Sequence, residues 1–218
     1  RFRHGHATHP QWPMALEMAL AQVQGSIGEN EGPNAPSLGF VYLSDQYGAD
    51  LPAIVSLLRE RTGIAHWTGA VASSVCANGV EYDGEPALAL MVAALAPDTF
   101  QVFSGRLRPP PGSEPAPDGS SRSHTALVHA DPALPDLAEL IQELSRRTAS
   151  GFLFGALTSG DSPAFTQVAD EAITGGLSGV MFSSSVRVLS RVTQGCSPLA
   201  GEHVISACRD HFLERLDG

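Results

Sequence analysis

The sequence predicts an α/β fold: duplicated βαβ units with additional antiparallel strands, forming mixed sheets flanked by helices. Residues 40–73 align without a gap to residues 126–159, at an offset of 86. Both segments have a strand–helix–strand pattern, and closely spaced strand-like segments follow each. We expect a first half over 1–108, a Pro/Gly/Ser-rich linker over 109–123, and a second half over 124–218.

An amphipathic helix is predicted near the start, in "HPQWPMALEMALAQVQ". Helical spacing places an apolar set on one face, and prolines precede and open the helix. The set is Trp12, Ala15, Leu16, Ala19, Leu20 and Val23.

The two aligned segments share identical residues as well as an apolar pattern. Two amphipathic helices that resemble each other by chance would not also keep flanking Asp, Gly-Ala and Ser positions in step, so we expect an internal repeat. The identical positions are Asp45/Asp131, Asp50/Asp136, Leu51/Leu137, Leu58/Leu144, Arg61/Arg147, Thr62/Thr148, Gly69/Gly155, Ala70/Ala156 and Ser73/Ser159.

Each copy begins with a buried strand, "LGFVYLS" or "TALVHA", and Asp50 or Asp136 is then expected to cap a helix. A second apolar segment follows each helix, so the two strands of a unit should be parallel neighbours. The helices should each bury one stripe, made of Leu51, Ile54, Val55 and Leu58 or of Leu137, Leu140, Ile141 and Leu144.

Further strands are predicted after each unit, too closely spaced for helical crossovers and therefore antiparallel. They are "EPALALMVAAL" and "FQVFSGRL" in the first half, and "GGLSGVMFS", "SVRVLSRVT", "EHVISACR" and "HFLERLD" in the second.

Composition excludes several classes of function. The net charge is −10, which argues against a nucleic-acid partner, and the chain has no lysine for a Schiff base or a phosphate-binding loop. The longest apolar run is about half of a membrane span, so we expect no membrane partner. No segment is typical of a secretory signal, and three unevenly spaced cysteines favour reduced thiols, so a cytoplasmic location is expected.

Cys196 in "VTQGCSPLAG" allows three interpretations. It could be a nucleophile with His203 or His211 as base, yet no local signature of a cysteine protease surrounds it. It could ligate a metal, but the C-x6-H-x4-C-x2-H spacing over Cys196, His203, Cys208 and His211 lacks the close pairs of structural zinc. We favour a small residue that packs or lines a pocket.

The histidines of "RHGHATHP" could chelate a metal in an extended segment, but the entry of the chain into a packed helix explains them as well. We therefore predict no metal and no cofactor.

Glycines and serines near strand ends are the main candidates for a binding site. Small residues let a ligand approach backbone, and hydroxyls with backbone N–H groups suit a carboxylate, although the glycines could equally serve close packing. The predicted ligand-binding residues are Gly69, Ser73, Ser74, Cys76, Ser159, Gly175, Gly176, Gln194, Gly195 and Cys196. No catalytic residue is predicted.

Three separated stretches resemble the FIST family, a bacterial sensory domain. They are "FRHGHATHPQWPMALEMALAQV", "GAVASSVCANGVEYDGEPALALMVA" and "GGLSGVMFSSSVRVLSRVTQGCSPLAGEHVISACRDHFLERLDG". The resemblance implies the family's N-terminal region and the start of its C-terminal region, so a pocket completed by the rest of the latter would be incomplete here. It also implies a signal-transduction input module that binds a small metabolite, with amino acids as the proposed class, and that signals to a protein partner.

Two alternatives remain open at this stage. One is a thiol-dependent enzyme using Cys196, and the other is an interaction scaffold that binds no ligand.

Overall fold

The computed structural model describes residues 2–24, 35–105, 123–159, 165–190, 201–209 and 212–218. The chain forms two compact units, Arg1–Val188 and Leu189–Gly218. The helices of the first unit are α1 (Trp12–Gln24), α2 (Leu51–Thr62) and α3 (Leu137–Arg146), with short 3-10 turns η1 (Asp45–Asp50) and η2 (Pro97–Thr99). None of the helices in the described residues is both long and apolar enough to cross a membrane.

The larger sheet of the first unit has six strands in the order β1-β6-β2-β3-β10-β11. Strands β2 and β3 are parallel, and every other neighbouring pair is antiparallel. The strands are β1 (Phe2–Thr8), β2 (Leu38–Ser44), β3 (His66–Ala72), β6 (Ala87–Ala93), β10 (Gln167–Ala169) and β11 (Glu171–Ile173).

The smaller sheet has four strands in the order β7-β12-β8-β9. Strands β8 and β9 are parallel, and β12 pairs antiparallel with both β7 and β8. The strands are β7 (Phe100–Gly105), β8 (Thr125–Ala130), β9 (Phe152–Leu157) and β12 (Leu177–Phe182).

Two hairpins complete the secondary structure of the described residues. In the first unit β4 (Ser74–Ala77) pairs with β5 (Val80–Asp83), and the Asn78-Gly79 turn between them has positive φ at both residues, as a tight hairpin requires. In the second unit β13 (Ile205–Arg209) pairs with β14 (Phe212–Leu216).

The two parallel pairs confirm the predicted α/β class and both predicted crossovers. Strand, helix and parallel strand follow one another in β2-α2-β3 and again in β8-α3-β9. The order β1-β6-β2-β3 in the larger sheet matches β7-β12-β8-β9 in the smaller one. A duplication in the sequence would explain this likeness, and it stays a prediction.

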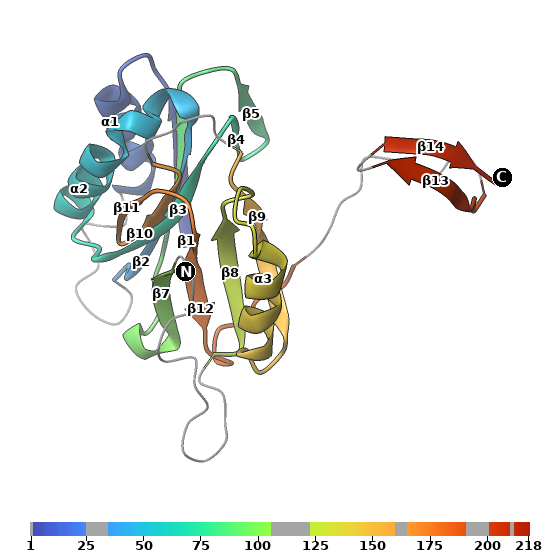
Figure 1. The fold of residues 1–218 in the computed structure, drawn as a ribbon. Coiled ribbons are helices and arrows are strands. Elements are labelled where there is room, and N and C mark those ends of the chain that lie inside the picture. The colour runs from blue at the N-terminus through green and yellow to red at the C-terminus, as the bar shows by residue number, and fades with distance from the viewer. Residues whose placement is uncertain (1, 25–34, 106–122, 160–164, 191–200, 210–211) are drawn as a thin grey trace. The chain divides into compact units, whose positions relative to one another are not determined.

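Helices cover the outer face of each sheet (Figure 1). Helices α1 and α2 lie on the larger sheet, and the four residues predicted for the stripe of α2 are all buried. Helix α3 lies on the smaller sheet through Leu140 and Leu144. The α1 residues buried in this way are Ala15, Leu16, Ala19, Leu20 and Val23.

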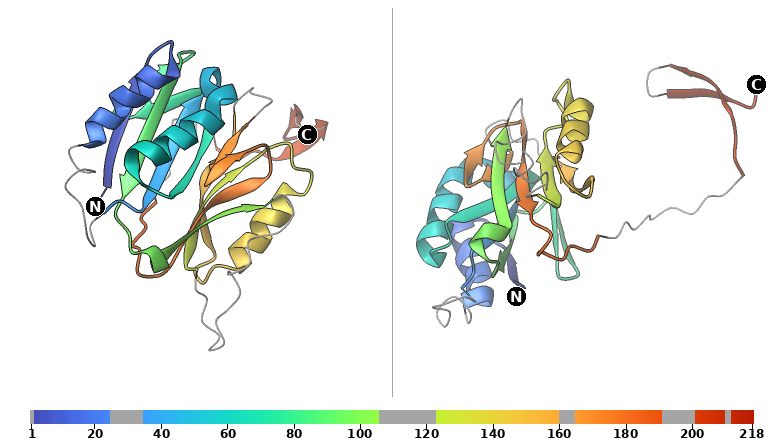
Figure 2. Two further views of the ribbon diagram at one scale, coloured as in Figure 1. Left: turned by 90° about the vertical axis from the view of Figure 1, so that its left-hand side faces the viewer. Right: turned by 90° about the horizontal axis from the view of Figure 1, so that it is seen from below.

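The inner faces of the two sheets pack against each other, which gives four layers from helix to helix (Figures 1 and 2). Leu38 and Phe40 of β2 meet Val180 and Phe182 of β12 in this apolar core. Burial of such side chains contributes roughly 1.5–3 kcal/mol each. Residues of both predicted halves, up to Val188, contribute to this core and form one compact unit: β10, from the second half, also pairs with β3, from the first.

Several local predictions fail. Asp50 and Asp136 occupy the N-cap positions, but neither side chain makes a capping hydrogen bond. Ile141, predicted to be buried, is 36% exposed because the stripe of α3 that contacts the sheet is narrower than predicted. No strand forms over 183–190, where one was predicted to begin, and nearly all of the predicted linker over 109–123 lies outside the described residues.

Candidate functional site

The carboxyl ends of the four parallel strands carry polar residues. Asp45 follows β2 and Asp131 follows β8, while Ser73 and Ser159 come just after β3 and β9. Ligands of α/β sheets bind beyond the carboxyl ends of parallel strands. A ligand site is therefore expected at this end of the first unit.

Ser73 and Ser159 contact each other, although their strands belong to different sheets. The backbone N–H of Ser73 donates to Oγ of Ser159 at 3.3 Å, and the two Oγ atoms lie 3.5 Å apart. Both residues are exposed. Two hydroxyls, each able to donate and to accept, are thus presented together to solvent.

Asp131 is held by backbone groups. Its Oδ1 accepts the N–H of Ala133 at 2.8 Å, and its own N–H donates to the carbonyl of Gly176 at 2.9 Å. Gly175 has φ +62°, and a Cβ on it would lie 2.7 Å from Oδ2 of Asp131. Gly175 and Gly176, both predicted ligand-binding residues, therefore have a structural role in positioning this carboxylate.

Asp45 lies at the start of η1, and its Oδ1 is buried without a hydrogen-bond partner among the described residues. A carboxylate oxygen removed from water and left unpaired costs free energy, so such an atom marks a place that a donor or a cation would fill. The identity of Asp45 with Asp131 was visible in the aligned segments, but the sequence did not indicate that either belonged to a site.

The remaining predicted residues are spread more widely. Gly69 lies buried in the middle of β3, not at its end, and a Cβ there would lie 1.7 Å from the carbonyl oxygen of Val41. Ser74 donates to Oδ1 of Asp83 at 2.6 Å within the β4-β5 hairpin, where Cys76 is exposed. Gln194, Gly195 and Cys196 lie outside the described residues, so the interpretations of Cys196, the thiol-dependent enzyme among them, stay predictions.

A cavity of about 300 Å³ lies beside the turn that holds Asp131. It is lined by Ser104, Gly105, Ile173, Thr174 and Gly175. Gly175 therefore borders both the cavity and the carboxylate, which makes this turn part of the candidate site.

A polar pair that sequence reasoning missed lies between the sheets. Oη of Tyr42 in β2 is 3.0 Å from Nε2 of His129 in β8, and Nδ1 of His129 has no partner among the described residues. Burial lowers the pKa of His129 to about 4 and raises the pKa of Tyr42 to about 12, so both are neutral at pH 7. Because polar residues within an apolar strand are also common in packed cores, "FVYLS" and "ALVHA" did not reveal the pair.

A second polar contact joins the sheets nearby. Oγ of Ser178 in β12 donates to Oε1 of Gln167 in β10 at 2.5 Å, and Nε2 of Gln167 donates to the carbonyl of Gly176 at 3.0 Å. These two hydrogen bonds connect Gly176, in the turn beside Asp131, to residues in the interior of the first unit.

Histidine clusters of the kind that bind metal do not form in the part of the chain that is described. No group of three or more His, Cys, Asp or Glu residues converges there. Nδ1 of His6 contacts Oη of Tyr82 at 2.7 Å, and the hydrogen bond from His203 lowers the pKa of Asp217.

Comparison with known proteins identifies the family. The FIST N domain matches residues 37–218, a range that contains both βαβ units and the candidate site. No match is found among curated proteins. The chain belongs to the FIST family, whose domains are sensory domains of signal transduction.

Proposed function

We propose that the carboxyl ends of β2, β3, β8 and β9 bind a small zwitterionic metabolite of the amino-acid class, and that the bound state is passed to a signalling protein. The observation that carries this proposal is the contact between Ser73 and Ser159, at 3.3 Å and 3.5 Å, at the end where Asp45 and Asp131 also follow their strands.

The residues supply complementary chemistry for such a ligand. Asp45 and Asp131 offer carboxylate oxygens to an ammonium group, and a charge-assisted bond of this kind is stronger than a neutral one. The hydroxyls of Ser73 and Ser159 are donors for a carboxylate. A ligand with both groups would use all four residues, while a simple acid would face two carboxylates of its own sign.

Ligand binding at these strand ends would connect the two sheets, and this connection is how the bound state would be passed to a partner. Ser73 follows a strand of the larger sheet and Ser159 follows a strand of the smaller one, so a ligand held by both fixes the end of one sheet to the end of the other. A ligand that binds only the folded arrangement stabilises it, by about 2.7 kcal/mol at a hundred times its Kd.

The experiment is a thermal-shift screen of the common L-amino acids, followed by calorimetric titration of any that raise the melting temperature. For each such amino acid, the acid lacking the amine and the amine lacking the carboxylate are titrated as well. The proposal predicts that the intact amino acid binds at least about tenfold more tightly than either analogue, because each lost charged contact costs more than about 1.4 kcal/mol. Equal binding of the deaminated acid would remove Asp45 and Asp131 from the site.

A further inference from the structure

The outer edge of β9 is an exposed apolar strand. Strand β9 is the last of its sheet among the described strands, and its residues Phe152 and Leu157 are 44% and 53% exposed. Its sequence, "FLFGAL", has no charged residue and no proline. Natural proteins protect an edge strand with charges, prolines or a cover, because its unpaired N–H and C=O groups bind other strands.

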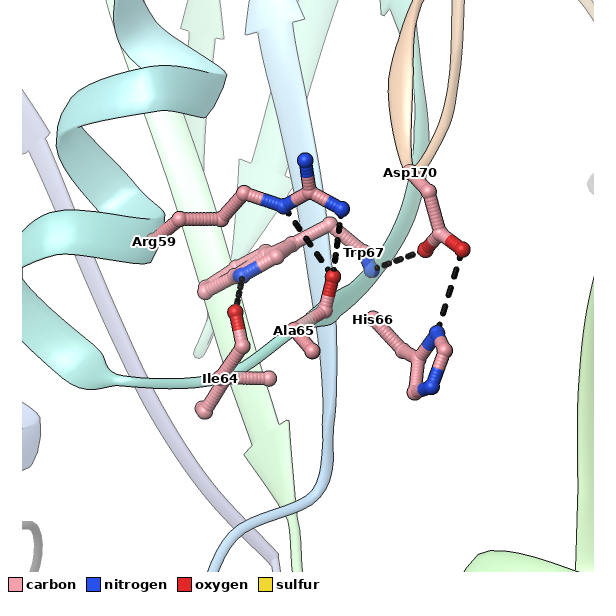
Figure 3. A network of polar contacts seen from close by, with 6 residues as sticks. All are labelled: Arg59, Ile64, Ala65, His66, Trp67 and Asp170. Carbon is pink, nitrogen blue, oxygen red and sulfur yellow. Dashed lines mark hydrogen bonds and ion pairs between the residues drawn. The ribbon is translucent and has the colours of Figure 1, made fainter.

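The corresponding edge in the larger sheet is covered. Strand β3 follows α2 as β9 follows α3, and β10 pairs antiparallel along β3. Figure 3 shows how the tip of the β10-β11 hairpin is fixed there: Asp170 accepts the N–H of Trp67 at 3.0 Å and contacts Nδ1 of His66 at 3.1 Å. The same corner is joined to α2 by Arg59, which donates to the carbonyl of Ala65.

Among the described residues, no strand pairs with the outer edge of β9. Residues 160–166 separate Ser159 from β10, and that length can span up to about 23 Å. After β3, by contrast, β4 begins at Ser74, directly after Ser73. Although Ser73 contacts Ser159 beyond the end of β9, the strand β4 pairs with β5 and not with β9.

We propose that the edge of β9 pairs antiparallel with β9 of a second copy of this chain. The edge of β3 already shows that the corresponding position accepts an antiparallel strand. Antiparallel pairing of one strand with itself is the arrangement that a twofold dimer requires. A strand without charges can face its own copy without repulsion, although the chain as a whole carries a net charge of −10.

The backbone groups of β9 that would bond to the second copy can be inferred from the groups of β3 that bond to Thr166 and Asp170. Val71 donates its N–H to Thr166, and the carbonyl of Trp67 accepts the N–H of Asp170. The parallel register places Leu157 and Leu153 of β9 at the corresponding positions. The N–H of Leu157 and the carbonyl of Leu153 are therefore expected to bond to the second copy.

The test is sedimentation velocity of the full chain over a range of concentrations, with Leu157→Lys as the variant. The variant places two lysines at one interface and should raise the dimer Kd by about tenfold or more. Val80→Lys is the control, because Val80 is also an exposed strand residue, at 42%, and lies in β5. It should leave the dimer Kd unchanged.

Hydrogen exchange gives a second readout. The amide of Leu157 should exchange more slowly as the concentration of protein rises. A chain that stays monomeric at every concentration would overturn the proposal and leave the edge to a strand of a different protein. Protection of Leu157 that does not depend on concentration would also overturn it, because the partner strand would then lie within the same chain.

Discussion

Tyr42 and His129 hold corresponding positions in the two βαβ units and contact each other across the interior. Tyr42 pairs with Ala70 of β3, and His129 pairs with Ala156 of β9. The 3.0 Å contact between Oη of Tyr42 and Nε2 of His129 thus joins corresponding positions of the two βαβ units. A polar pair that is buried among apolar residues depends on its partner, because water cannot replace it.

Removing the hydroxyl tests this dependence. Tyr42→Phe should lower the free energy of unfolding by about 1–3 kcal/mol, since the ring of His129 is left without its partner. Urea denaturation of both proteins measures the change. Tyr82→Phe is the control: Tyr82 also bonds to a histidine, His6, but in a more exposed place, so a loss under about 1 kcal/mol is expected. Equal losses of unfolding free energy in the two variants would show that the buried contact contributes no more to stability than the more exposed one.

The low pKa of His129 makes stability depend on pH. Burial lowers it from 6.5 to about 4, so between these values the unfolded chain binds a proton that the folded chain does not. The free energy of unfolding should therefore fall as the pH drops from 6.5 to 4, by up to about 3 kcal/mol, and this contribution is complete above pH 6.5. Urea denaturation at several pH values, compared with His129→Gln, isolates the effect. If the variant kept the same slope, another group would be responsible.

Gly69 is predicted to be essential for strand spacing and not for ligand binding. In Gly69→Ala the new Cβ would lie 1.7 Å from the carbonyl oxygen of Val41, which forces β2 and β3 apart. We expect a loss of more than about 3 kcal/mol, or failure to fold. Gly79→Ala is the control, because its φ is +79° but no atom lies within 4 Å of the new Cβ, so a cost of about 1 kcal/mol is expected. Circular dichroism with thermal denaturation compares the two variants.

The sequence predicted much of the fold because both helices between parallel strands have a clear apolar period. It could not predict which residues of β2 and β8 face each other. The ungapped alignment places Tyr42 over Val128, whereas strand pairing makes Tyr42 correspond to His129. His129 lies eight positions before Leu137, the first residue of α3, whereas Tyr42 lies nine positions before Leu51, the first residue of α2. A shift of one residue reverses the face of a strand.

The candidate site was predicted only in part. The positions of Ser73 and Ser159 after apolar strands indicate a site, and the structure brings these two residues together. Asp45 and Asp131 were equally visible as identical residues, but an Asp after a strand is also common in plain turns. The role of Gly175 depends on its short distance to Asp131. These two residues lie far apart in the sequence, so no local pattern indicates that they meet.

Replacing Asp131 tests the carboxylate half of the site. Asp131→Asn keeps the bond that its side-chain oxygen accepts from Ala133 and removes the charge. It should weaken an amino acid found by the screen by about tenfold or more and leave the melting temperature of the free protein nearly unchanged. Asp98→Asn, in η2, is the control for a lost surface charge. Weaker binding in both variants would indicate a general effect of net charge.

Calorimetric titration of the double variant Ser73→Ala/Ser159→Ala tests the central claim most directly. The matched control is Ser183→Ala/Ser185→Ala, which removes another pair of serines whose hydroxyls lie 2.7 Å apart, after the end of β12. The account predicts that an amino acid selected by the screen binds the control like the original protein and binds the double variant at least about tenfold more weakly. Unchanged binding to the double variant, or no binding of any amino acid to the original protein, would contradict it.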